Sequence, residues 1–239
     1  MNALPPKACT SIARRIAQIT ESINECCLRS GRKSEEIKLM AVSKFFPRED
    51  VEAALQAGIT LFGESRVQEA ETKFAGWRTG AHEGELHLIG GLQRNKAKRA
   101  LAIFDCIQSV DRTSLIDTLG ELTTGREKPL MILLELNCGE VQKGGYRHED
   151  ELFGAAERVF RYPALELRGL MTVAPFTEDV ACVRQSFRRL FQAREKLWQA
   201  FPGTKLSTLS MGMSGDYPIA IEEGATLIRI GTAIFGERQ

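Results

Sequence analysis

The chain has 239 residues, of which 43% are hydrophobic and 26% are charged, as in ordinary globular proteins. Thirty-two basic residues balance 31 acidic ones, so no large field of one sign would draw the chain onto nucleic acid or a membrane surface. The longest apolar runs, such as residues 130–134, are too short to span a bilayer. The N-terminal segment lacks the continuous apolar core of a secretory signal, so we expect a cytoplasmic protein.

Neither the cysteines nor the one basic stretch indicates a metal or nucleic-acid site. The six cysteines lack CxxC spacing and a histidine at ligand spacing, so we expect small core or half-buried thiols and no metal. The stretch at residues 92–99 has four basic residues but no aromatic side chains between them. It is typical of a solvated helix face, although an anion or nucleic-acid patch is the alternative.

Amphipathic and apolar segments alternate along the chain, with no linker between them. The first is a helix that Thr10 or Ser11 can cap, and its isoleucines at 12, 16, 19 and 23 form one apolar stripe. Strands are expected at residues 37–44, 59–64, 85–90, 106–110, 129–137, 165–173, 205–211 and 226–231. Helices are expected at residues 47–58, 66–74, 93–103, 111–122, 148–160, 178–199 and 217–223.

Eight strands, each followed by a helix or helical turn, predict an α/β fold with a single (β/α)8 TIM-type barrel. Several strands are near-continuous aliphatic runs, as in parallel sheets covered on both faces. An open doubly wound sheet is the alternative, but the segment after the first strand has no glycine fingerprint. We expect one domain over residues 1–239, with the N-terminal helix packed across the barrel as an additional element.

Lys44 ends the first predicted strand, where barrels place functional residues. Strand alternation puts Met40, Val42 and Lys44 on one face, so this lysine would project into the mouth of the barrel above an apolar floor. A desolvated lysine has the lowered pKa that Schiff-base formation with an aldehyde requires. The alternative is an ordinary solvated lysine at a strand end.

The loops after the last two strands have the composition of a phosphate site. Barrel phosphate sites frequently use these loops, where backbone amides approach the anion. Small or hydroxylated residues stand there in both segments, although such residues are also common in turns. They are Ser210, Gly212, Ser214, Gly231 and Thr232.

Arg229 lies within the last strand and shares a face with Leu227 and Gly231. An unpaired charge inside a barrel is costly, so the guanidinium needs a partner. Either a carboxylate such as Glu135 or a bound ligand would supply it.

Six segments carry a family resemblance between Ile37 and Gly236: IKLMAVSKFFP, LFGESRVQE, HLIGGLQRNK, RGLMTV, LSMGMSGD and RIGTAIFG. Together they resemble the pyridoxal phosphate homeostasis protein family (YggS/PROSC-like), whose fold is that of the N-terminal barrel of alanine racemase. Each segment by itself has modest specificity for the family, but six segments in the family's order over nearly the whole chain are highly specific. The resemblance implies that the barrel binds pyridoxal 5'-phosphate (PLP).

The resemblance implies roles for the matching residues. Lys44 falls on the lysine that holds PLP as a Schiff base, and Arg229 on the arginine that faces the pyridine nitrogen. An arginine keeps its proton, so Arg229 would leave that nitrogen unprotonated and weaken the ring as an electron sink. The phosphate-binding residues fall on Ser210, Met211, Gly212, Gly231 and Thr232.

Other matching positions are less specific. His87 and Asn137 are expected to line the mouth and Met171 to pack beside the ring, with core packing as the alternative for all three. Lys143 matches a loop lysine that the family uses around the cofactor. Ser65 stands where the family has asparagine, which leaves any contact of that amide open.

Two functions are compatible with these residues. The first is a monomeric PLP-binding protein that buffers the cofactor or delivers it to apo PLP enzymes, without turnover. The second is a small PLP-dependent amino-acid racemase, which needs proton-transfer groups on both faces of the substrate. We expect the C-terminal domain that supplies a tyrosine in alanine racemases to be absent, because the chain ends eight residues after Gly231. The first function is therefore favoured, although Tyr146 or Tyr217 could approach the mouth.

Overall fold

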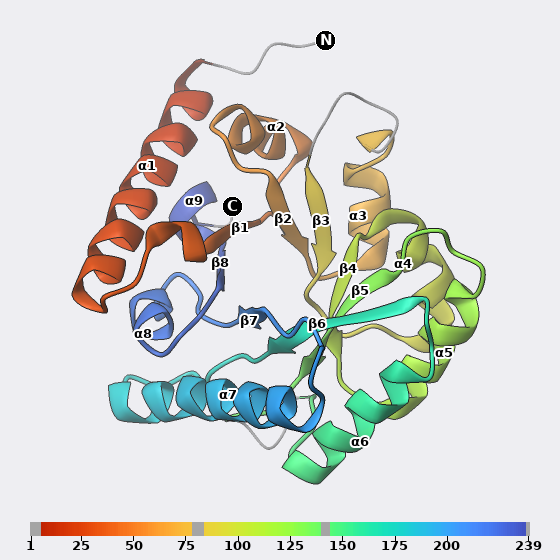
Figure 1. The fold of residues 1–239 in the computed structure, drawn as a ribbon. Coiled ribbons are helices and arrows are strands. Elements are labelled where there is room, and N and C mark those ends of the chain that lie inside the picture. The colour runs from red at the N-terminus through yellow and green to blue at the C-terminus, as the bar shows by residue number, and fades with distance from the viewer. Residues whose placement is uncertain (1–5, 78–83, 140–143, 238–239) are drawn as a thin grey trace.

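The structure, a computed structural model, describes residues 6–77, 84–139 and 144–237, with side chains from residue 10 onward. Eight parallel strands form one closed barrel in chain order, with helices around it (Figure 1). The ring closes where β1 pairs with β8, with Met40 opposite Arg229 and Ala41 opposite Ile230. The predicted (β/α)8 barrel is confirmed.

The strands are short and nearly all buried. They are β1 Lys38–Val42, β2 Leu61–Glu64, β3 Glu85–Leu88, β4 Cys106–Val110, β5 Leu130–Glu135, β6 Leu165–Met171, β7 Thr208–Ser210 and β8 Leu227–Ile230. The α-helices are α1 Pro6–Arg29, α2 Arg48–Gln56, α3 Val67–Lys73, α4 Ala97–Ile103, α5 Thr113–Thr123, α6 Glu149–Phe160, α7 Val180–Ala200, α8 Tyr217–Glu222 and α9 Thr232–Phe235. Within the described residues, 3-10 helices also span Ser34–Glu36 and Arg94–Lys96. No helix among the described residues is long and apolar enough to cross a membrane.

The N-terminal helix lies in the outer helical layer, beside α2, α8 and α9, and does not cross the barrel (Figure 1). The four isoleucines of its stripe are all buried. The last helix of the barrel, α9, is only four residues long and leaves room in the helical layer that α1 fills. The Tyr217 hydroxyl joins α8 to α1 by donating to Ser22 Oγ at 2.7 Å.

The core has an outer and an inner part, as strand alternation requires. The large outer cluster lies between strands and helices. Two small apolar clusters fill part of the interior: Met40, Val42, Leu61 and Leu227, and on the opposite side Cys106, Leu133 and Met171. The cysteines at 26, 27 and 106 are buried free thiols, as expected.

The first strand is shorter than predicted. β1 ends at Val42, and Lys44 lies in the turn that follows it. The amide of Ser43 still donates to Gly63 O at 3.1 Å, but Phe46 N then turns back to Ser43 O at 3.0 Å. Phe45 takes a φ of +70°, which a non-glycine residue rarely adopts. The chain therefore leaves the sheet one residue before Lys44.

Candidate functional site

The register of β1 and β8 brings the Lys44 turn beside the segment that follows β8. Ala41 pairs with Ile230, so the two chains leave the sheet at the same level. The nearest atom to a Cβ built on Gly231 is the carbonyl oxygen of Val42, at 3.4 Å. Lys44 follows Val42 by two residues and is partly buried. The turn that carries Lys44 and the Gly231–Thr232 turn therefore begin at adjacent positions on neighbouring strands.

Arg229 lies inside the barrel at this end and is 4% exposed. Its Nη1 donates to Ser210 Oγ at 2.6 Å and its Nη2 donates to Thr172 O at 2.7 Å. Burial lowers the pKa of Arg229 to about 10, although the carboxylates of Asp216 and Glu135 act through space in the opposite direction. The guanidinium is thus still charged at neutral pH, and its hydrogen-bond partners are a hydroxyl and a carbonyl.

The loops after β7 and β8 meet and form one surface. Thr232 Oγ1 donates to Ser214 Oγ at 3.2 Å, and Ala233 N donates to the same oxygen at 3.4 Å. Gly212 has a φ of +91°, and a Cβ there would lie 2.6 Å from Ala220 Cβ. Only glycine fits this position without strain. The small residues of the two loops therefore do come together, as the sequence indicated.

Two of the residues expected to bind phosphate have other hydrogen bonds. The Met211 side chain is buried in the outer core, and its amide donates to Leu227 O at 3.1 Å. The hydroxyl of Ser210 accepts from Arg229 and donates to Gln108 Oε1 at 2.6 Å. These contacts leave Gly212, Gly231 and Thr232 as the better supported part of the expected anion site.

A buried ionic cluster lies directly behind the Lys44 turn. Lys73 of α3 donates to Glu64 Oε1 at 2.8 Å and to Glu69 Oε1 at 2.9 Å. The side chain of Lys73 is 7% exposed and that of Glu64 is fully buried. Burial raises the pKa of the Glu64 carboxyl even though Lys73 opposes the shift.

This cluster holds both residues that flank Lys44. Lys73 Nζ donates to Ser43 O at 2.6 Å, and the Ser43 hydroxyl donates to Glu64 Oε1 at 2.8 Å. On the other side of Lys44, the Phe45 amide donates to Glu69 Oε1. Hydrogen bonds to charged groups are among the stronger ones in proteins. The turn that presents Lys44 is therefore fixed from behind by three side chains, none of which we predicted as part of the site.

His87 does not line the carboxyl-end mouth as expected. It lies deep in the barrel, where its Nδ1 is 2.8 Å from Gln108 Nε2. Its Nε2 faces the amino end of the barrel, 3.4 Å from Glu85 Oε2. The reason is its register, because His87 pairs with Gly63 one residue before the end of β3.

The other expected positions differ in depth. Asn137 does lie at the carboxyl end, where its Oδ1 accepts from Gly139 N at 3.2 Å. Met171 is buried inside the barrel beside Cys106 and Leu133. Ser65 lies against Gly90, and a Cβ built on Gly90 would be 2.3 Å from the carbonyl oxygen of Ser65. Lys143 lies outside the described residues.

Gln108, which the sequence did not single out, connects Arg229 to His87. Ser210 donates to its oxygen, so its amide nitrogen is left to donate to His87 Nδ1. The hydrogen bonds therefore run in one direction, from Arg229 through Ser210 and Gln108 to His87. Gln108 is fully buried in β4, and only its polarity within an apolar strand could have marked it.

The chain is similar to known proteins over most of its length. Residues 21–239 match the family model of the alanine racemase N-terminal domain. The chain is 39% identical to the pyridoxal phosphate homeostasis protein of Pasteurella multocida, over 95% of this chain and 98% of that protein. It is 37% identical to the protein of the same name from Escherichia coli K12, over 95% and 97% of the two chains.

Solved structures show the same fold. PipY of Synechococcus elongatus, solved with PLP bound, superposes with a TM-score of 0.81 at 34% identity, over 94% of this chain and all of that chain. Alanine racemase from Bacillus anthracis shares the fold alone, with a TM-score of 0.68 at 19% identity over 92% of this chain and 55% of that chain. The chain belongs to the pyridoxal phosphate homeostasis protein family, within the alanine racemase N-terminal domain family.

Proposed function

We propose that this protein binds PLP as a Schiff base on Lys44 and serves intracellular PLP homeostasis, buffering or delivering the cofactor in the cytoplasm without substrate turnover. The observation that carries the proposal is the β1–β8 register, which sets the Lys44 turn beside Gly231. Curated relatives are named for PLP homeostasis, and PipY has been solved with PLP bound. When bound, PLP supplies an aldehyde for the lysine and a phosphate for the loops.

Each end of the ligand has a matching group in the chain. The amine of Lys44 would bond to the aldehyde, and the loops around Gly212, Gly231 and Thr232 would hold the phosphate. The left-handed backbone at Gly212, where a Cβ would not fit, is an observation consistent with a backbone cradle for an anion. Arg229 remains charged at neutral pH, and beside the pyridine nitrogen of PLP it would leave that nitrogen unprotonated, which would disfavour carbanion chemistry.

The tyrosines support a protein without racemase activity. The Tyr217 hydroxyl points to Ser22 on α1, and that of Tyr162 donates to Asp117 Oδ1 at 3.0 Å on the surface between α5 and α6. Tyr146 is packed in the outer core, and burial raises the pKa of its hydroxyl. Racemisation needs a second acid–base group opposite the lysine. None of the chain's three tyrosines is placed as that group.

The first test is spectroscopic. Purified protein with PLP should show the absorbance of a Schiff base, and Lys44→Ala should lose it. Lys98→Ala, at an exposed lysine on α4, is the matched control and should keep it. If Lys44→Ala retains the band, the cofactor is held elsewhere.

The second test separates a carrier from an enzyme. Holo-protein is mixed with an apo PLP enzyme in the presence of a scavenger of free PLP. Direct delivery predicts activation despite the scavenger, whereas activation that the scavenger abolishes means passive release.

In parallel, racemisation of alanine and serine should stay at the rate of the Lys44→Ala protein. Sedimentation should give a monomer.

A further inference from the structure

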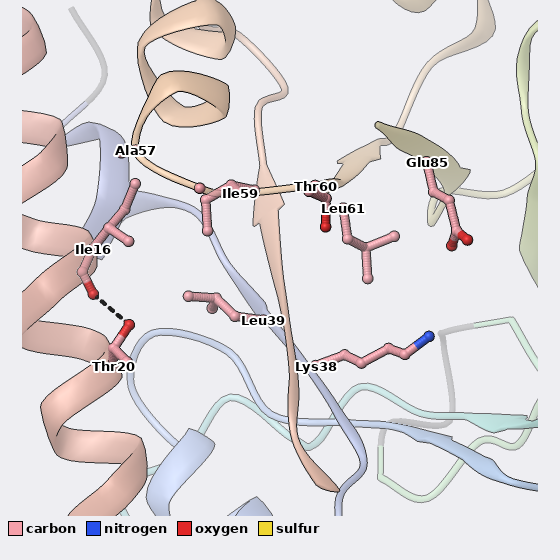
Figure 2. A pocket seen from close by; sticks show the side chains of 10 residues that line it. Ile16, Thr20, Lys38, Leu39, Ala57, Ile59, Thr60, Leu61 and Glu85 are labelled. Atoms are coloured by element: carbon pink, nitrogen blue, oxygen red, sulfur yellow. Dashed lines mark hydrogen bonds between the residues drawn. The ribbon is translucent and has the colours of Figure 1, made fainter. Parts of the chain in front are cut away.

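The barrel has a cavity at its amino end, opposite the Lys44 turn. Its volume is about 190 Å³, which suits a small organic molecule better than one water with its share of about 30 Å³. Lys38, Leu61 and Glu85 line it and also line a larger neighbouring cavity of about 400 Å³ beneath α1. Figure 2 shows the side chains of Lys38 and Glu85 reaching into this space from β1 and β3.

Charges of both signs line the amino-end cavity. Lys38 and Arg168 contribute cations, and Glu85 contributes a carboxylate. Contact with His87, and then the charges of Lys38 and Arg168, lower the pKa of the Glu85 carboxyl, so Glu85 is ionised at neutral pH. A neighbouring acid, Glu166, already pairs with Arg168 at 3.0 Å. Glu85 is therefore the carboxylate that a ligand cation would meet.

A buried donor faces the same cavity. Gln108 donates to Nδ1 of His87, so the proton of the neutral imidazole is on Nε2. The His87 side chain is 8% exposed, and among the described residues its Nε2 has only a long contact with Glu85 Oε2 in place of a well-formed hydrogen bond. A buried N–H without a hydrogen bond is costly unless a ligand or water accepts from it. This donor lies 3.4 Å from Glu85 Oε2, close to where a polar ligand group would be held.

We propose that the amino-end cavity is a second binding site, for a small α-amino acid. The carboxylate of the ligand binds to Lys38 and Arg168 and accepts from His87 Nε2, its ammonium group binds to Glu85, and its short side chain packs against Leu61 and Leu227. A zwitterion fits because it carries a charge complementary to each sign in the cavity. A simple anion would be repelled by Glu85, and a simple cation would be repelled by Lys38. The site is independent of the cofactor proposed for the other end.

Calorimetry with L-alanine tests the site, with propionate and ethylamine as probes that each lack one charge. We expect saturable binding of alanine, at least about tenfold (about 1.4 kcal/mol) tighter than either probe, because each probe lacks one of the two charged contacts. Lys38→Met and Glu85→Gln should each weaken alanine about tenfold, and the control Lys98→Met should not. Lys44→Ala should bind normally, which separates this site from any reaction at the carboxyl end.

A residue-specific readout keeps the test clear if a variant folds poorly. The chain has only three histidines, so protein labelled in its histidine rings gives three Cε1–H signals in NMR spectra. The His87→Asn variant identifies the signal that comes from His87. Alanine should shift the His87 signal saturably and leave the other two unchanged. The proposal is overturned if no binding saturates, if propionate binds as tightly as alanine, or if the His87 signal does not move.

Discussion

Two buried cations, one outside and one inside the barrel wall, are stabilised in different ways. Lys73, in the outer layer, is paired directly with Glu64 and Glu69. Arg229, in the interior, hydrogen bonds to the Ser210 hydroxyl and to a backbone carbonyl. The outer cluster is a closed ionic unit that shapes the turn at Lys44. The inner cation has neutral partners, so its charge can still act on a bound ligand.

The largest expected effect comes from breaking the outer unit. Lys73→Met leaves the carboxylate of Glu64 buried without its cation, which should cost about 3–5 kcal/mol of unfolding free energy. Urea denaturation measures the loss. The double variant Lys73→Met, Glu64→Gln removes both charges and should recover much of it. A loss below about 1 kcal/mol in the single variant would mean that the cluster does not hold the turn.

Breaking the series of hydrogen bonds from Arg229 to His87 inside the barrel should have a smaller effect on stability. Gln108→Leu removes the acceptor of Ser210 and the donor to His87, and should cost about 1–3 kcal/mol. The His87 imidazole signal should also shift, because its tautomer is no longer fixed. Gln192→Leu, at an exposed position on α7, serves as control. An unchanged imidazole signal in Gln108→Leu would contradict the assigned direction of the hydrogen bonds.

The loop above Arg229 offers a matched pair of glycines. Gly212→Ala should cost about 1–2 kcal/mol, because the position has a φ of +91° and no room for a Cβ, and should also weaken PLP binding. Gly215→Ala meets no atom within 4 Å and should change stability by less than about 0.5 kcal/mol. Thermal unfolding and PLP titration of both variants provide the comparison. Equal PLP affinities would remove Gly212 from the proposed phosphate cradle.

The pH dependence of the Lys73→Met variant sharpens the comparison further. Burial already raises the pKa of Glu64, and loss of Lys73 raises it more. A carboxyl with a raised native pKa binds more protons when folded, so the unfolding free energy falls as pH rises through that pKa. The difference in unfolding free energy between wild type and Lys73→Met should therefore shrink on acidification, by up to about 1.4 kcal/mol per pH unit. Denaturation at about pH 5 and about pH 8 checks this, and a constant deficit would contradict it.

The sequence was sufficient for the barrel and for the position of β1 beside β8, because strand order determines both. It was not sufficient for side chains whose partners are distant in the chain. Gln108 of β4 connects His87 of β3 to Ser210 of β7, and no local pattern indicates these contacts. Lys73 forms a visible i,i+4 pair with Glu69, but its contact with Ser43 depends on how α3 packs. The depth of His87 likewise depends on the register of β3 in the ring.

Borohydride reduction of the PLP-loaded protein, followed by peptide mass analysis, tests the central claim most directly. The account predicts that the reduced cofactor is attached to the peptide containing Lys44 and that Lys44→Ala protein carries none. Attachment to another lysine, or an unmodified Lys44 peptide in fully loaded protein, would contradict it.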